Sequence, residues 1–206
     1  HDLSKPILSS WQVASLRLVS AGLVLVPFVP RYLKKIATAD LRYIALSGII
    51  GTLIPAFLFT LAETKIDGAF AGTLNSLTPG FVIIVAAFFF SKKITSQSLR
   101  GIIVAFIGSA IVFYFNWSDH GRNSLGNVSF AWFCVLATFF YGLNVNMVDK
   151  VMANTHPMAV AVIAFASLVI PAFIALYITG YFSLPLGESK YIIATLASVT
   201  LGIIGT

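Results

Sequence analysis

The side chains of this sequence that could act on another molecule are mainly uncharged polar groups inside long apolar stretches. In one stretch, Asn75, Ser76 and Thr78 precede Pro79. Proline has no N–H to donate, so Pro79 leaves the carbonyl of Asn75 without its helical partner. The spacing of Gly72, Asn75 and Pro79 places all three on one face of a helix. Such a face can hydrogen-bond a small polar solute, but it carries no group that makes or breaks covalent bonds.

Two further stretches carry similar groups. The first surrounds Pro55, whose missing N–H frees the carbonyl of Gly51. In the second stretch, the side chains of Thr138, Tyr141 and Asn144 lie within about one third of the helix circumference. Together with the first group, the predicted cavity residues are Thr52, Phe57, Asn75, Ser76, Thr78, Pro79, Thr138, Tyr141 and Asn144.

These polar groups admit two interpretations. They can line a cavity that receives a solute, or they can hydrogen-bond neighbouring helices. Interhelical hydrogen bonds of this kind are common in membrane bundles and contribute about 1 kcal/mol each. The residues alone leave both alternatives open.

Ionisable groups are scarce inside the apolar stretches, and this scarcity argues against an enzyme. Arg17 lies six residues into its stretch, close enough to a surface for its side chain to reach it; a substrate-binding cation is the alternative. Glu63 ends an apolar stretch, as expected of an interfacial acid. The histidines lie in connections and have no metal-ligand or catalytic spacing. We therefore predict no catalytic residue, no metal and no cofactor.

The elements that must position these groups are seven apolar runs joined by short polar connections. A helix needs about 20 apolar residues to cross a bilayer, and hydrophobic residues make up 58% of the chain against 10% that are charged. The sequence predicts an all-α polytopic membrane protein. The runs are Trp11–Val29, Leu41–Ala62, Gly68–Phe90, Ser98–Phe115, Val128–Val148, Pro157–Phe182 and Lys190–Thr206.

The basic residues flank these runs, and their distribution predicts an orientation. The net charge of +6 is not gathered into a patch with interleaved aromatics, so we expect no nucleic-acid partner. Cytoplasmic connections are enriched in lysine and arginine. Eight such residues fall in alternate connections and four in the others, which places loops 30–40, 91–97 and 149–156 in the cytoplasm. Loops 63–67, 116–127 and 183–189 then face outward.

A short internal echo suggests a repeat. The residues Gly48-Ile49-Ile50-Gly51-Thr52 recur as Gly202-Ile203-Ile204-Gly205-Thr206, five runs later. An odd number of spans per repeat gives the two copies opposite membrane orientations, as in many secondary transporters. Coincidence among common membrane residues is the alternative.

Stripes of small residues predict where helices approach closely. Gly68 and Gly72 form one stripe, and Gly101, Ala105 and Gly108 form another. Because small side chains let two backbones come near each other, we expect both stripes to be packing surfaces.

Three segments resemble the drug/metabolite transporter superfamily, and within it the EamA-type permeases. They are Ala14–Leu18 with the run ending at Pro27, Ala71–Pro79, and Ile94-Thr95 followed by Leu99–Ile102 and Gly108. The resemblance implies ten spans in two inverted five-span repeats, around a cavity formed largely by spans one, three, four, six, eight and nine. It places the seven runs at spans two to eight of a longer protein. One departure is Lys92, where the family usually has a glutamate.

On that resemblance, residues 1–116 form the first repeat without its first span, and residues 117–206 form a truncated second repeat. The implied function is secondary transport or export of small metabolites, such as amino-acid-like solutes, by alternating access. The implied location is a bacterial inner membrane, with a metabolite and membrane lipid as partners and self-association into a homodimer left open. The alternatives are a non-transporting membrane scaffold or assembly subunit, and a membrane-embedded transferase.

Overall fold

The computed structural model describes residues 7–120 and 128–205, and every regular element in these two ranges is helical. Five helical segments are long and apolar enough to cross a membrane: Ser10–Leu33, Thr38–Ala62, Gly68–Phe90, Ala131–Val151 and Pro157–Ile178. The predicted runs 98–115 and 190–206 correspond to the shorter apolar helices Ser96–Ile111 and Ser189–Ile204. The all-helical membrane fold is thus confirmed. The ten-span inverted arrangement stays a prediction.

Three of the five spans are interrupted, and each interruption lies beside a proline. The first consists of α1 (Ser10–Leu25), a 3-10 turn (Val26–Phe28) and α2 (Val29–Leu33). The second consists of α3 (Thr38–Gly48), a π-helical segment (Ile49–Leu53) and α4 (Ile54–Ala62). The third divides into α5 (Gly68–Asn75) and α6 (Thr78–Phe90). Proline removes a helical hydrogen bond and clashes with the carbonyl four residues before it, which accounts for the position of each interruption.

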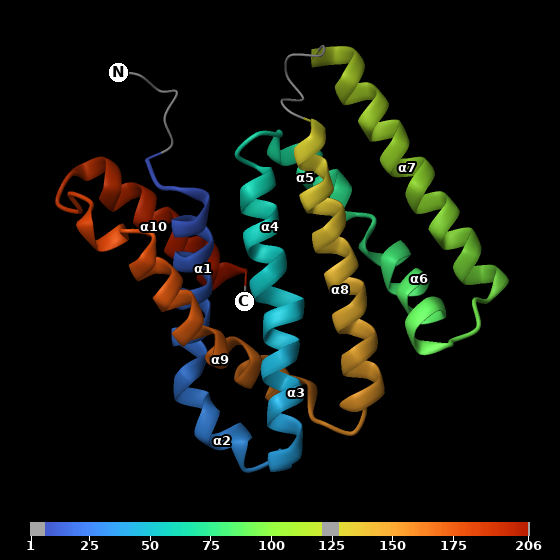
Figure 1. The fold of residues 1–206 in the computed structure, drawn as a ribbon, viewed down its shortest axis with the longest axis horizontal. Helices are drawn as coiled ribbons and strands as arrows, with labels where there is room; N and C mark the ends of the chain where they lie inside the picture. The colour runs from blue at the N-terminus through green and yellow to red at the C-terminus, as the bar shows by residue number, and fades with distance from the viewer. Residues whose placement is uncertain (1–6, 121–127, 206) are drawn as a thin grey trace. The chain divides into compact units, whose positions relative to one another are not determined.

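The remaining helices run without such a break. They are α7 (Ser96–His120), α8 (Ala131–Val151), α9 (Pro157–Ile178) and α10 (Ser189–Ile204) (Figure 1). Short 3-10 turns precede α8 at Val128–Phe130 and follow α9 at Tyr181–Ser183.

The chain packs as two units. Unit 1 holds the described residues up to Ile49 and from Asn154 onward, and unit 2 holds Ile50–Ala153. These units are groups of helices that pack together. The predicted boundary between residues 116 and 117 separates two repeats in the sequence, which is a different division. That boundary stays a prediction.

Unit 1 is built on α1, which packs against α9 and α10, while α2 and α3 also pack on α9. A Cβ atom placed on Gly22 would lie 2.7 Å from the carbonyl oxygen of Phe165, so only glycine allows α1 to approach α9 this closely. Ser9 caps α1: its hydroxyl accepts from the Gln12 amide, and Gln12 Oε1 accepts from the Ser9 amide. Gln12 Nε2 also donates to the carbonyl of Thr179, 3.0 Å away, which ties the start of α1 to the end of α9.

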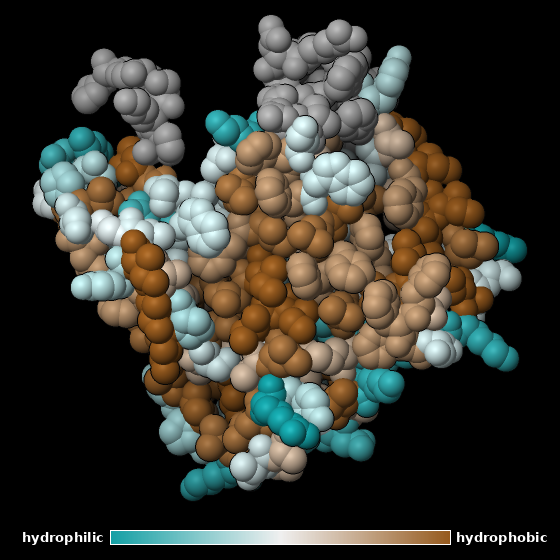
Figure 2. Space-filling model, in the orientation of Figure 1, coloured by the Kyte–Doolittle hydropathy of each residue, from teal (hydrophilic) through white to brown (hydrophobic). Residues whose placement is uncertain are grey.

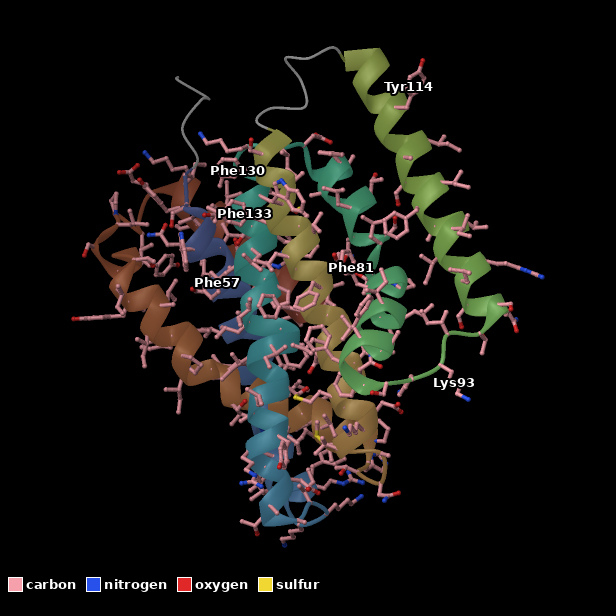
Figure 3. All side chains as sticks on the ribbon, turned by 45° about the vertical axis from the view of Figure 1, so that its right-hand side comes forward. Phe57, Phe81, Lys93, Tyr114, Phe130 and Phe133 are labelled. Carbon is pink, nitrogen blue, oxygen red and sulfur yellow. The ribbon has the colours of Figure 1, made fainter. Side chains whose placement is uncertain are left out.

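Unit 2 is built on α8, which packs against α4, α5 and α6, while α7 packs against α5 and α6. Cys134 on α8 lies in a buried cluster with Ala62 and Phe70. Nearby, the rings of Phe130 and Phe133 stack edge-on with their centroids 5.4 Å apart (Figure 3). The surface over α4 and α8 is mostly apolar, as expected of helices that face lipid or further protein (Figure 2).

Candidate functional site

The break between α5 and α6 holds four of the nine predicted cavity residues. Thr73 and Leu74 accept hydrogen bonds from the amides of Ser76 and Leu77 at 3.1 Å, which tightens the end of α5. α6 then restarts with Pro79 in its first turn. The prediction that Pro79 frees the Asn75 carbonyl needs a correction. Thr78 Oγ1 donates to that carbonyl at 2.7 Å, so the neighbouring side chain replaces the missing amide.

Much of the surface at this break is exposed and polar. Asn75, Ser76 and Pro79 are exposed, and Thr78 is half-buried. Ser76 Oγ shares a hydrogen bond with Ser109 Oγ of α7, 3.0 Å away. Thr78 Oγ1 also donates to the side-chain oxygen Oδ1 of Asn75, 3.2 Å away. The side-chain amide group of Asn75 therefore keeps hydrogen-bonding capacity at mid-span, where lipid offers no partner.

The second group of predicted residues lies at the π-helical segment. Pro55 is buried at the start of α4, and the wider turn at Ile49–Leu53 accommodates it. Thr52 lies in that segment and is half-buried. Wider turns of this kind are frequent at functional sites in helices.

Asn144 of α8 faces the same segment. A Cβ atom on Gly51 would overlap the side-chain amide of Asn144, so this glycine is required for the contact. Asn144 Oδ1 is buried and accepts no hydrogen bond from any described residue. A buried oxygen without a donor is unfavourable by about 1–3 kcal/mol. This atom is therefore an open acceptor beside the π-helical segment.

The structure does not bring the other predicted residues into one open site. Thr138 is buried, and its hydroxyl donates to the Val135 carbonyl of its own helix at 2.7 Å. The Tyr141 ring stacks on the Phe59 ring of α4 at a centroid distance of 6.2 Å. Phe57 of α4 is half-buried (Figure 3). Their assignment to a cavity stays a prediction.

Sequence reasoning missed the polar contact that joins α8 to α6. Asn146 is buried, and its Nδ2 donates to the carbonyl of Val82 at 2.8 Å and to that of Gly142 at 2.9 Å. A Cβ atom on Gly142 would lie 2.8 Å from the backbone of Phe81. The sequence signal for this contact is the spacing of Gly142 and Asn146, which lie four residues apart on one helix face. Small and amide side chains are typical of helix interfaces.

The predicted packing stripes are wrong for the described chain. A Cβ atom on Gly68, Gly72, Gly101 or Gly108 would meet no atom within 4 Å. The close approaches occur instead at Gly22, Gly48, Gly51, Gly142 and Gly202. Glycine spacing alone does not reveal which side of a helix has a neighbour.

The charged groups lie mainly at span ends. Lys92, at the end of α6, forms an ion pair with Asp149 near the end of α8, and Lys150 lies over the Phe90 ring. Arg17 is exposed on α1 and pairs with no acid in the described ranges, so the choice between anchor and substrate cation stays open. Among the described residues, no group of three histidines, cysteines or acids is placed to hold a metal.

Comparison with known proteins assigns a family to this architecture. The model of the EamA-like transporter family matches residues 4–114. A protein of Archaeoglobus fulgidus named an uncharacterized transporter is 32% identical over 105 residues, which are 51% of this chain and 38% of that protein. An uncharacterized transporter of Clostridium kluyveri is 28% identical over 113 residues, which are 53% of this chain and 36% of that protein. The matched part thus spans less than two fifths of either relative. No solved structure matches the chain.

Proposed function

The chain belongs to the EamA-like transporter family, and from this premise we propose that it is part of a secondary transporter that moves a small polar metabolite across a membrane. Its helices make it a multi-pass membrane protein. The proposed location is a bacterial inner membrane, and the proposed mechanism is alternating access.

The observation that carries this proposal is the exposed amide at the break between α5 and α6. An apolar span that serves only as an anchor has no use for an interruption flanked by Asn75 and Ser76. Discontinuous spans of this kind commonly form the substrate sites of secondary transporters. Non-helical backbone at membrane depth is tolerated where it is covered by protein or lines a water-filled cavity. We assign the exposed side of this break to such a cavity.

The groups at the break favour a solute without net charge. They are amides and hydroxyls, and Asn144 Oδ1 adds an unpaired acceptor in the same unit. A neutral or zwitterionic solute can satisfy its polar groups with such partners. A multiply charged anion would lose its hydration there without an opposing charge, which is strongly unfavourable. An amino-acid-like metabolite is the cargo class that we propose.

The sequence echo supports an inverted repeat. Gly48 and Gly202, the first residues of the two copies, both lie at close helix contacts within unit 1. A Cβ atom on Gly48 would lie 3.0 Å from the carbonyl oxygen of Ala164, and one on Gly202 would lie 2.8 Å from Arg17 Cα. Two copies of a repeat are expected to use matching positions for the same packing role. Inverted repeats underlie alternating access in many transporters.

The test is solute exchange by the full-length protein in proteoliposomes. Vesicles preloaded with one unlabelled amino acid receive the same amino acid in labelled form, and a panel of neutral, cationic and anionic amino acids is compared. We expect labelled neutral solutes to accumulate above the level in empty vesicles, because an alternating-access carrier exchanges solute in both directions. Absence of exchange for the whole panel would favour the scaffold alternative, and chemical conversion of a solute would favour a transferase.

A further inference from the structure

A cluster of exposed basic residues lies in unit 1 where α2 is followed by α3. Arg31, Lys34, Lys35 and Arg42 are all exposed. None of them pairs with an acid in the described ranges. Asp40 is the acid nearest in sequence, and it lies half-buried in the first turn of α3, where the helix N-terminus favours a negative charge. Hydrophilic residues gather at this end of α2 and α3 (Figure 2).

Two tyrosine rings hold two of these cations in place. Lys35 Nζ lies 5.5 Å from the centroid of the Tyr32 ring. Arg42 lies over the Tyr43 ring, with 4.7 Å between its guanidinium carbon and the centroid, and its Nη2 donates to the Tyr43 hydroxyl at 3.0 Å. Cation–π contacts of this kind orient a charge without neutralising it.

The ring of Tyr32 is itself supported by a distant part of the chain. Its centroid lies 6.1 Å from that of His156, the residue that precedes α9. Tyr32 and Tyr43 are both half-buried. The cluster is therefore built on packed aromatic rings, and not on a free loop.

The depth of the cluster follows from the two spans that it joins. Ser10–Leu33 and Thr38–Ala62 are apolar enough to occupy the hydrocarbon layer, so residues 34–37 lie at the headgroup level. Tyrosine is enriched at that level because its ring is apolar and its hydroxyl is polar. Lys34 and Lys35 consequently lie where lipid phosphates are found, and Arg31 and Arg42 lie about one helical turn from that level, which their long side chains can reach.

Two other basic residues near span ends provide a contrast. Lys92 pairs with Asp149, and Lys190 pairs with Glu188 at 2.8 Å. The α2–α3 cluster has no such partner among the described residues, although it holds four cations. Clusters of four or more lysines and arginines next to a span are typical of sites for anionic lipid.

We propose that Arg31, Lys34, Lys35 and Arg42 form a binding site for the headgroup phosphate of an anionic phospholipid. The guanidinium groups match the phosphate oxygens in a fork, and the lysines add point charges. The site uses none of the residues of the proposed cavity. It holds whether or not the protein transports a metabolite.

The test measures lipid retention by the full-length protein with native mass spectrometry. The protein receives equal amounts of phosphatidylglycerol and phosphatidylcholine with identical acyl chains, and the ratio of bound lipids is recorded. Lys34→Gln/Lys35→Gln should lower the preference for phosphatidylglycerol by about fivefold for each lysine removed. Lys34→Arg/Lys35→Arg should keep the preference, because the charge is retained.

The matched control is Lys65→Gln/Lys93→Gln, which removes two exposed lysines outside the cluster. Lys93 projects from the connection between α6 and α7 (Figure 3). We expect this variant to keep the wild-type lipid ratio. Equal loss in the control variant, or no loss in Lys34→Gln/Lys35→Gln, overturns the site. Binding of inorganic phosphate by a protein that shows no preference for phosphatidylglycerol over phosphatidylcholine overturns it as well, because the cluster is then a site for free phosphate.

Discussion

The two halves of the span Gly68–Phe90 belong to the same stretch of sequence but differ in how closely they approach α8. The half formed by α6 is fixed to α8, where Asn146 donates to the Val82 carbonyl and Gly142 allows the two backbones to approach. The half formed by α5 contacts α8 through Phe70 and Ala71 in a buried cluster, yet its glycines border open space. Pro79 and the turn before it separate a half whose backbone closely approaches α8 from a half whose glycines border open space.

The difference shows that residue type does not determine role in an apolar helix. Asn75 and Asn146 are the same residue in similar surroundings along the sequence, yet one is exposed and the other is 2% exposed. Gly72 and Gly142 differ in the same way. Each matched pair allows the two regions to be tested with a single substitution.

The largest effect on stability is expected from the glycine pair. Gly142→Ala places a methyl group 2.8 Å from the backbone of Phe81, so α6 and α8 must move apart. Overpacking of this kind lowers the free energy of unfolding by about 1–3 kcal/mol. Gly72→Ala meets no atom and should raise the free energy of unfolding by about 0.5–1 kcal/mol, because alanine favours the helix.

Both glycine variants are measured in the full-length protein by thermal unfolding in detergent. If Gly72→Ala destabilises as much as Gly142→Ala, the exposed side of α5 is covered by protein. The comparison between the two halves would then fail, and Gly72 would be a packing residue after all.

The asparagine pair separates transport from stability. Asn75→Leu should lower solute exchange at least tenfold, about 1.4 kcal/mol, and leave the free energy of unfolding nearly unchanged. Asn146→Leu removes the hydrogen bonds to the Val82 and Gly142 carbonyls. The bond to Val82 joins two helices, and its loss should lower the free energy of unfolding by about 0.6 kcal/mol, the average for interhelical hydrogen bonds in membranes, and by no more than about 1.7 kcal/mol.

Exchange in proteoliposomes and unfolding in detergent are recorded for both asparagine variants. Full exchange by Asn75→Leu would remove this residue from the cavity. A large loss of stability in Asn75→Leu would instead assign it to an interhelical contact, as in Asn146.

The parts of this fold that sequence predicts are those decided within one helix. The apolar runs predict the helices, because the lipid requires both length and continuous hydrophobicity. Pro55 and Pro79 predict where two spans are interrupted, because a missing N–H acts on the same chain four residues back. The structure places a π-helical segment beside the first and a break before the second.

The parts that sequence does not predict depend on a second helix. Gly142 contacts Phe81, and Asn144 contacts Gly51. To predict either contact, one must already know which helices pack against α8. Small-residue spacing selected Gly68 and Gly108 instead, which border open space. The prediction for the Asn75 carbonyl failed for a reason within one helix. The Thr78 hydroxyl donates to this carbonyl in place of a backbone amide, and the hydropathy pattern does not reveal such a replacement.

A smaller effect is expected at the break itself. Thr78→Val keeps the shape of the side chain but removes the hydroxyl that donates to the Asn75 carbonyl. We expect the free energy of unfolding to fall by about 1 kcal/mol. Adding Pro79→Ala should recover the loss, because the alanine amide can donate to the same carbonyl. Thr78→Ser is the control and should keep wild-type stability; equal destabilisation by Thr78→Ser would show that the methyl group, and not the hydroxyl, matters.

The smallest effect is expected from the ion pair between Lys92 and Asp149, although it joins the ends of the fixed pair α6 and α8. The two side chains are 47% and 64% exposed, so water screens their attraction. Exposed pairs contribute about 0.2–1 kcal/mol. A double-mutant cycle with Lys92→Ala and Asp149→Ala, measured by unfolding at low and high salt, should give a coupling energy in this range that falls as salt rises. A larger coupling that is independent of salt would mean that the pair is shielded from water in the whole protein. The end of α6 would then be held by charge as well as by Gly142 and Asn146.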